Sequence, residues 1–465
     1  MAGIYVHIPF CKSRCRYCDF FSTTQLERRE DYAHAIIAEF NDRLHLLTEP
    51  VRTIYFGGGT PSQMPVASLR MILECLVDGA KRLQFSAQPY TLHSTPYTLH
   101  SSAPRSTYHS SLIVHNLKNT LPPTQPYTLH SSAPRSTYHS SLIVHNLKNT
   151  LHPTPYTLHS SALRSTYHSS LIVHNLKNTL HPSPDEIGDI ELTLEANPGD
   201  ITPEKARAWR EMGFNRLSIG IQSFDDDLLH LIGRRHTAQE ALQAVATAQA
   251  AGFDNISIDL MYALPSQTME QWQKDVQLAL HLGIQHISTY GLIYEEGTAL
   301  TKLLMDNRLQ PVDEELEMRM YDYLVGQLTA NGFLHYEVSN FALPGRHSRH
   351  NSSYWNDTPY LGLGAAAHSY DGQHRQWNIA DLDGYIRQAL AHQLSPEIEH
   401  LSDEDRHTER VMLGLRTSQG VAKADIDMHK AKPYLEQGLL EDKGERVAAT
   451  TQGFHILNRI IEDLV

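Results

Sequence analysis

Short apolar runs alternate with helical patterns through most of the chain. The runs are rich in β-branched and aromatic residues and lie at 4–8, 53–56, 191–195, 216–221, 255–261 and 286–292. The helical patterns between them have start and stop signals: Thr202-Pro203 before Gly213, Thr237 with Glu240 before Gly252, and Thr268 with Gln271 before Gly283. Strands that alternate with helices predict a parallel sheet of βαβ units. Six such units favour an α/β partial barrel.

The pattern changes after residue 292. A helix is expected at 313–331, followed by a strand-like run at 336–341 and a Gly-, Ala- and His-rich run at 360–370. From about residue 395 the sequence becomes strongly helical, at 403–415 and 424–438, with a short strand at 446–450 and a final helix. We therefore expect a small, mostly helical C-terminal domain at 395–465.

A repetitive segment interrupts the alternation between the second and third strands. Residues 96–121, 126–151 and 155–180 are near-copies of one another. Twelve of the 29 histidines lie between Gln88 and His181, so a metal-binding tract is one interpretation. The favoured interpretation is a duplicated, disordered insertion rich in Ser, Thr and Pro at 88–184, because long surface insertions cost little closure entropy. The core would then comprise 1–87 and 185–394.

Composition narrows the class of protein. The chain has 465 residues, 41% of them hydrophobic, which is enough for a substantial core. It has no apolar run of membrane-spanning length and no secretory signal pattern. A net charge of −13 argues against a general nucleic-acid-binding surface. Four cysteines do not make a disulfide framework, so we expect a soluble, cytoplasmic protein; peripheral membrane association stays open.

Three of those cysteines form one motif directly after the first predicted strand. Cys11, Cys15 and Cys18 have C-x₃-C-x₂-C spacing. Three thiolates from one short loop suit an iron–sulfur cluster with one iron left open for another ligand. The alternatives are a zinc site completed by His7 or a distant ligand, and plain structural cysteines. Zinc sites of this kind usually have a second cysteine pair, which the sequence lacks.

Polar residues also stand at the ends of the later predicted strands. The glycine-rich turn Gly57-Gly58-Gly59-Thr60 follows the second strand, Glu195 and Gln222 end the third and fourth, and Asp259 lies toward the end of the fifth. Each could separately be structural. In α/β barrels, however, the C-terminal ends of the strands assemble the site on one rim. We therefore expect these residues to surround the cysteine loop.

The motifs together resemble a known family. YVHIPFC followed by Cys15 and Cys18, with GGGTPS, LEANPG, GIQSF and IDLMYALPSQT, is similar to the radical S-adenosylmethionine (SAM) superfamily. The likeness is to the oxygen-independent coproporphyrinogen III oxidase family and, most of all, to its heme chaperone branch, called HemW. It extends over essentially everything outside 88–184. It implies a radical SAM (β/α)₆ partial barrel, with a HemN-like C-terminal domain.

The resemblance also implies roles for single residues. Cys11, Cys15 and Cys18 would hold a [4Fe-4S] cluster whose free iron binds SAM. The residues at positions that contact SAM in the family are Tyr5, Tyr17, Gly58, Gly59, Thr60, Glu195, Gln222, Arg234 and Asp259. The chemistry implied is one-electron reduction of the sulfonium, with the protein positioning the cofactor and excluding water.

Two further features separate the oxidases from the chaperones. Oxidases have a fourth cysteine two places after the third, where this chain has Phe20. Chaperones have a His-Asn-x-x-Tyr-Trp motif, matched here by His350, Asn351, Tyr354 and Trp355. We expect this motif to bind heme, with His350 as iron ligand and with Arg346 and Arg349 near the propionates. The resemblance thus favours a heme chaperone that delivers heme to an unnamed acceptor, with porphyrinogen oxidation as the alternative.

Overall fold

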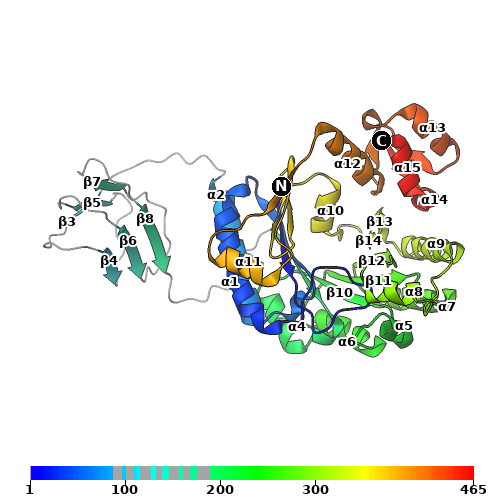
Figure 1. Ribbon diagram of the computed structural model, residues 1–465, viewed down its shortest axis with the longest axis horizontal. Helices are drawn as coiled ribbons and strands as arrows, with labels where there is room; N and C mark the ends of the chain where they lie inside the picture. Colours follow the sequence, from blue (N-terminus) through cyan, green and yellow to red (C-terminus); the bar gives the residue numbers. More distant parts are fainter. Residues whose placement is uncertain are drawn as a thin grey trace. The chain divides into compact units, whose positions relative to one another are not determined.

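The computed structural model describes residues 2–86 and 189–465, together with six short strands in the segment between them (Figure 1). The chain divides into two compact units. One comprises Met1–Ala87 with His181–Val465, and the other is Gln88–Leu180.

The first unit contains a sheet of twelve strands in the order β13-β14-β12-β11-β10-β9-β2-β1-β15-β16-β17-β18. Its centre is parallel and consists of β15 (Tyr360–Leu363), β1 (Ala2–Ile8), β2 (Val51–Gly58), β9 (Glu191–Ala196), β10 (Arg216–Gln222), β11 (Ile256–Tyr262) and β12 (His286–Gly291). Six of these strands are the predicted ones, which confirms the α/β fold. The seventh, β15, was not expected from the sequence.

Antiparallel strands extend the sheet at both edges. At one edge β12 pairs with β14 (Asn340–Ala342), which pairs with β13 (Leu334–Glu337). At the other edge the sheet continues through β16 (His368–Tyr370), β17 (His374–Trp377) and β18 (Glu397–His400). The predicted run at 336–341 is therefore the turn region of a hairpin.

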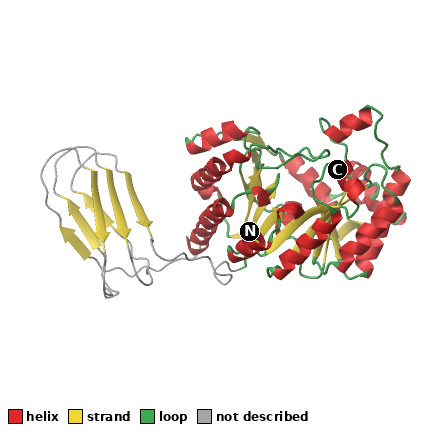
Figure 2. Cartoon of the chain, turned by 90° about the horizontal axis from the view of Figure 1, so that it is seen from below, coloured by secondary structure: helices red, strands yellow, loops and turns green. Residues whose placement is uncertain are grey.

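Helices flank the sheet (Figure 2). They are α1 (Arg29–Arg43), α2 (Val66–Ser86), α4 (Pro203–Glu211), α5 (Asp226–Leu231), α6 (Ala238–Ala250), α7 (Met269–His281), α8 (Ala299–Met305), α9 (Glu314–Ala330), α10 (Arg349–Trp355) and α11 (Leu382–Leu390). The predicted start signals are confirmed: Thr202, Thr237 and Thr268 each accept a backbone hydrogen bond at an N-cap, and the last two form capping boxes.

Alternation along the strands separates the core from the polar interior of the partial barrel. In β10, Leu217, Ile219 and Ile221 are fully buried in the hydrophobic cluster that the helices also enter. The alternate positions of the same strand include the polar residues Arg216, Ser218 and Gln222. Because side chains alternate faces along a strand, one face packs against helices and the other lines the inside of the curved sheet.

The C-terminal region has a small hydrophobic cluster of its own. It includes α12 (Asp403–Leu415), α13 (Met428–Glu436), α14 (Thr451–Phe454) and α15 (Leu457–Leu464), with a three-stranded sheet of β19 (Val421–Ala422), β21 (Arg446–Ala449) and β20 (Leu440–Asp442). The expectation of a small, mostly helical region is confirmed. It belongs to the same compact unit as the barrel.

The repetitive segment forms the second unit. The sequence favours disorder across 88–184; within that range the structure describes six strands in two parallel three-stranded sheets. They are β3 (Tyr97–His100), β5 (Tyr127–Ser131) and β7 (Thr157–Ser160) in one sheet, and β4 (His109–His115), β6 (His139–His145) and β8 (His168–His174) in the other. The remaining residues, and the histidine side chains of the suggested metal tract, lie outside the described part.

Candidate functional site

The three motif cysteines lie on the loop between β1 and α1. All are free thiols and half-buried. The Sγ of Cys11 lies 3.3 Å from Thr60 Oγ1, and Arg234 Nη1 donates to Cys15 Sγ at 3.5 Å. Burial raises the pKa of Cys11 and raises that of Cys18 to about 11. The thiols of Cys11 and Cys18 are therefore protonated when no metal is bound, and metal ligation must release those protons.

The structure bears on the alternative in which His7 completes a zinc site. Among the described residues, no three His, Cys, Asp or Glu side chains converge as ligands of one metal ion. His7 is also committed, because its Nδ1 bonds to Tyr5 Oη at 3.2 Å and its Nε2 to Phe21 O at 2.9 Å. The zinc interpretation that uses His7 would break both hydrogen bonds.

The glycine-rich turn after β2 packs directly against the start of the cysteine loop. Gly58 has φ +107°, and a Cβ atom there would lie 2.6 Å from the His7 ring. A Cβ atom on Gly59 would lie 2.7 Å from the carbonyl carbon of Pro9. Side chains at these positions would therefore push the two loops apart. The turn keeps its backbone close to the cysteines, as the sequence predicts.

Two half-buried carboxyl groups, those of Glu195 and Asp259, lie near that turn inside the barrel. Glu195 accepts hydrogen bonds from Tyr55 Oη at 2.7 Å and from Gly58 N at 3.2 Å. Burial raises the pKa of Glu195 to about 7 and that of Asp259 to about 6. Both carboxyls could thus ionise on meeting a cation such as the ammonium group of an amino acid.

Arg234 and Gln222 complete the predicted set on this rim. Arg234 follows α5, is half-buried, and donates to Gly220 O as well as to Cys15. Gln222 ends β10 in a left-handed conformation with φ +75°, which turns the chain away from the sheet at this point. The structure therefore brings the cysteines, the glycine turn, Glu195 and Arg234 together.

The sequence analysis missed one buried cation, Arg216, at the start of β10. It is 1% exposed, and its Nε and Nη1 atoms are buried without a hydrogen-bond partner among the described residues. Its charge lowers the pKa values of Glu195 and Asp259, partly opposing the effect of burial. The signal was present in the alternation of RLSIGIQ, because Arg216 shares its face with Ser218, Gly220 and Gln222.

The predicted heme motif forms helix α10, and its histidine enters the barrel. His350 is 1% exposed, with Nδ1 bonded to Thr53 Oγ1 at 2.8 Å and Nε2 to Tyr354 Oη at 2.9 Å. Its ring stacks on that of Tyr55 with centroids 5.0 Å apart. Both ring nitrogens of this predicted iron ligand are therefore occupied.

The other predicted heme residues lie elsewhere. Asn351 is half-buried; its backbone N donates to the capping side chain of Ser348. Trp355 lies at the far end of α10 and lines a cavity beside the C-terminal domain. Arg346 and Arg349 form ion pairs with Asp254 and Asp189, at 3.4 and 3.0 Å. The structure thus does not gather the predicted heme residues at one point.

Comparisons with known proteins agree with this geometry. The model of the radical SAM superfamily matches residues 5–100 and 162–279, and that of the HemN C-terminal domain matches 401–456. A mitochondrial radical S-adenosyl methionine domain-containing protein 1 from Bos taurus is 38% identical over 60% of this chain and 68% of its own length. The chain belongs to the radical SAM superfamily.

Several relatives that match nearly the whole chain are named as heme chaperones. A heme chaperone HemW from Lactococcus lactis is 28% identical over 98% of this chain and 96% of its own length. The coproporphyrinogen III oxidase HemN from Escherichia coli, a radical SAM enzyme, shares the fold with a TM-score of 0.66 at 17% identity. The structural match covers 99% of this chain and 89% of the HemN chain.

Two residues of the radical SAM loop remain to be placed. Tyr17 lies among Leu228, Ile232 and Met261 in a small hydrophobic cluster, and burial raises its pKa. Phe20, at the position where the resemblance implies a cysteine for an oxidase, is 65% exposed. None of the described helices is long and apolar enough to cross a bilayer.

Proposed function

We propose that this radical SAM protein is a heme chaperone, which binds heme and passes it to an acceptor protein while carrying a [4Fe-4S] cluster and SAM. The observation that carries the proposal is the match, over nearly the whole of both chains, to a relative named as a heme chaperone. Phe20 supports it, because the cysteine that distinguishes the oxidases is replaced by an exposed apolar side chain.

The cluster would be held by Cys11, Cys15 and Cys18. Thr60 and Arg234, which contact two of the sulfurs, would donate hydrogen bonds to thiolates once the protons have left. Such hydrogen bonds and the nearby positive charge stabilise thiolate and adjust the potential of a bound cluster. Stabilisation of a thiolate would account for the close approach of Arg234 to Cys15.

SAM would bind on the same rim, next to the cluster. The glycine turn from Gly58 to Thr60 would carry its methionine end, and Glu195 would meet a positive group there as its carboxyl ionises. Gln222, Arg234 and Asp259 would line the remaining side, with Tyr5 and Tyr17 flanking the loop. Cluster and SAM together supply one-electron chemistry. The residues around them would orient SAM and exclude water.

Heme would be handled near helix α10, which carries His350, Asn351, Tyr354 and Trp355. His350 can reach an iron atom only by leaving its hydrogen bonds to Thr53 and Tyr354. Its buried imidazole is neutral, because burial lowers its pKa to about 3. A neutral imidazole is the form that ligates iron.

The second candidate is an oxygen-independent coproporphyrinogen III oxidase, favoured by the fold shared with HemN. An anaerobic assay of the reconstituted protein with SAM, reductant and coproporphyrinogen III separates the two functions. We expect no protoporphyrinogen IX, together with stoichiometric heme binding by the same preparation. Turnover of the porphyrinogen would contradict the chaperone proposal and establish the oxidase.

A further inference from the structure

Asp200 is a buried carboxyl group outside the predicted set of site residues. It ends the short helical turn Pro198–Asp200, which follows β9. Its side chain is 0% exposed. An ionised carboxyl in such a place is costly unless hydrogen bonds and a positive charge compensate for the lost contact with water. Asp200 has both.

The partners of Asp200 come from two other loops at strand ends. Ser62 Oγ donates to its Oδ2 atom at 2.9 Å, and Gln63 Nε2 donates to the same oxygen. Both residues follow the glycine turn after β2. Lys12 Nζ, on the cysteine loop after β1, donates to the Oδ1 atom at 3.0 Å. The loops after β1, β2 and β9 therefore meet at one carboxyl group.

The turn that carries Ser62 and Gln63 is held in place without help from the cysteine loop. Ser62 O accepts a hydrogen bond from Lys205 Nζ at 3.0 Å. Gln63 O accepts one from Arg29 Nη1 at 2.6 Å. Asp200 and its neutral partners thus form a fixed anchor, and the ion pair with this anchor restrains the cysteine loop.

The two halves of the cysteine loop are held in different ways. In the second half, the backbone N and O of Arg16 bond to the end of α5 and to the start of α8, at 2.9 and 2.8 Å. In the first half, side chains contact the neighbouring loops, from Cys11 to Thr60 and from Lys12 to Asp200. Loss of the ion pair would therefore leave the chain after Cys11 less restrained than the chain that follows Arg16.

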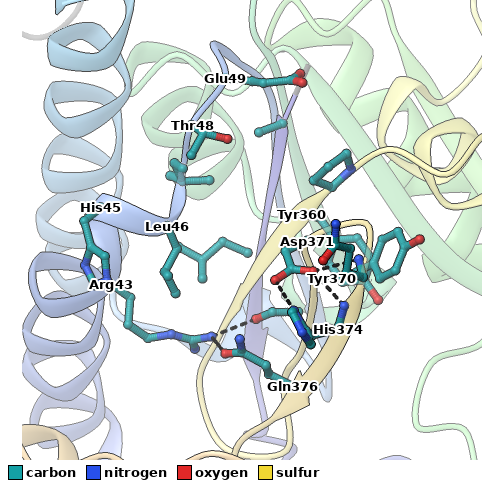
Figure 3. A pocket seen from close by; sticks show the side chains of 16 residues that line it. Arg43, His45, Leu46, Thr48, Glu49, Tyr360, Tyr370, Asp371, His374 and Gln376 are labelled. Carbon is teal, nitrogen blue, oxygen red and sulfur yellow. Dashed lines mark hydrogen bonds and ion pairs between the residues drawn. The ribbon is translucent and has the colours of Figure 1, made fainter. Parts of the chain in front are cut away.

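A second buried ion pair provides a comparison away from the rim. Arg43 donates to Glu39 Oε1 at 2.6 Å, and also to Ser369 Oγ and Gln376 Oε1 at 3.1 and 3.2 Å. Arg43 lines a cavity of about 310 Å³ between the end of α1 and strands β15 to β17 (Figure 3). These bonds join α1 to the edge of the sheet and include no residue of the cysteine loop. Breaking this pair should therefore lower stability without moving the cysteines.

We propose that Lys12 and Asp200 are positioning residues for the cluster. Their ion pair holds the chain after Cys11 against the segment that follows Gly58–Thr60, and so fixes the cluster relative to the SAM that the glycine turn would carry. Coordination of SAM by the free iron needs the two within bonding distance, so a shift of about 1 Å in the loop is enough to weaken it. The inference rests on the proposed function, because it presupposes cluster and SAM at the rim.

The test is an anaerobic titration of the reconstituted, full-length protein with SAM, followed by the electron paramagnetic resonance spectrum of the chemically reduced cluster. Lys12→Met keeps most of the length of the side chain and removes its charge. This variant should assemble the cluster and need about tenfold more SAM for the same spectral change. Lys12→Arg, which can restore the ion pair with Asp200, should respond to SAM as the wild type does.

A double variant tests whether the two residues act together. Asp200→Asn alone should weaken the SAM response as Lys12→Met does. The double variant Lys12→Met/Asp200→Asn should respond no more weakly than either single variant, because all three lack the same interaction. Arg43→Met is the matched control. It also breaks a buried ion pair, so its thermal midpoint should fall, while its SAM titration should match that of the wild type.

The outcomes separate the positioning role from the function. A Lys12→Met variant whose cluster spectrum and SAM titration equal those of the wild type would overturn the proposal and leave the function standing. An equal loss of SAM response in Arg43→Met would also overturn it, because a general loss of stability would then account for the effect. Failure of Lys12→Met alone to assemble the cluster would support it in a stronger form. Wild-type protein that assembles no cluster, or whose cluster spectrum does not change with SAM, would contradict the proposed function itself.

Discussion

The cysteine rim and helix α10 differ in how far the structure gathers the residues that the sequence predicts for them. At the rim, Glu195 and Cys11 already have partners on neighbouring loops, so the site is largely assembled without its cofactors. On α10, His350 enters the barrel, whereas Trp355 lines a cavity at the far end of the helix. A preassembled rim suits cofactors that stay bound, whereas residues spread along one helix must rearrange before they can meet one ligand.

The same contrast appears within the linear motif on α10. His350 bonds through both ring nitrogens, to Thr53 and Tyr354, and must leave these partners before it can bind a ligand. A linear motif therefore identifies the region of a site without showing which of its side chains faces the ligand.

The largest effect expected is on the rim. Cys15→Ala should abolish the visible absorbance of the reconstituted cluster, because two thiolates from this loop cannot hold a cubane. Cys75→Ala, in helix α2 and outside the loop, should retain it. Heme binding by Cys15→Ala should persist if the rim and the α10 motif are separate sites. An unchanged cluster spectrum in Cys15→Ala would instead point to other metal ligands.

The free energy of unfolding should depend on pH through Glu195, a carboxyl of the rim. The pKa of folded Glu195 is about 7, above its ordinary value of 4.5, so folded protein holds a proton that unfolded protein loses in this range. The free energy of unfolding should therefore fall as pH rises from about 4.5 to 7, by on the order of 3 kcal/mol from this group. Denaturant titrations should show this dependence reduced in Glu195→Gln. Parallel curves for both proteins would mean that Glu195 titrates normally.

A smaller loss of stability is expected from a residue that supports the rim from behind. Asp275 on α7 accepts hydrogen bonds from Ser223 Oγ at 2.7 Å and from Phe224 N at 2.8 Å, and so holds the turn after Gln222. Asp275→Ala should lower the free energy of unfolding by about 2 kcal/mol. The exposed Glu211→Ala is the control. Equal stability of the two variants would show that the turn does not depend on Asp275.

The smallest effect should come from the repetitive unit. Replacing Gln88–Leu180 with a short Gly/Ser linker should leave the cluster content and the heme affinity of the protein unchanged, because this segment forms a compact unit of its own. Circular dichroism would measure the folding of the shortened chain. A cluster titration and a heme titration would measure its cluster content and its heme affinity. Failure of the shortened chain to fold would show that the rim depends on the repeats.

The success of the sequence-based prediction differed between the same two regions. Capping residues and alternating strands predicted the barrel, and the parallel strand order then placed Glu195 near the cysteine loop. Strand β15 was missed because Tyr360–Leu363 is short and contains Gly362, which lacks a strand-forming side chain. Arg216 was missed because an arginine at a strand end usually faces water.

The arrangement of the α10 motif could not be predicted from its spacing. His350 enters the barrel, whereas Trp355 lines a cavity beside the C-terminal region. Sequence spacing describes neighbours along one element, and it carries no information about a surface that two distant elements create.

Native mass spectrometry under anaerobic conditions tests the central claim most directly. Reconstituted protein mixed with one equivalent of heme should give an ion that carries the [4Fe-4S] cluster and one heme together, because the cysteine rim and the α10 motif consist of different residues. Heme that appears only on molecules without a cluster, or that displaces it, would contradict the account and place both groups at the rim.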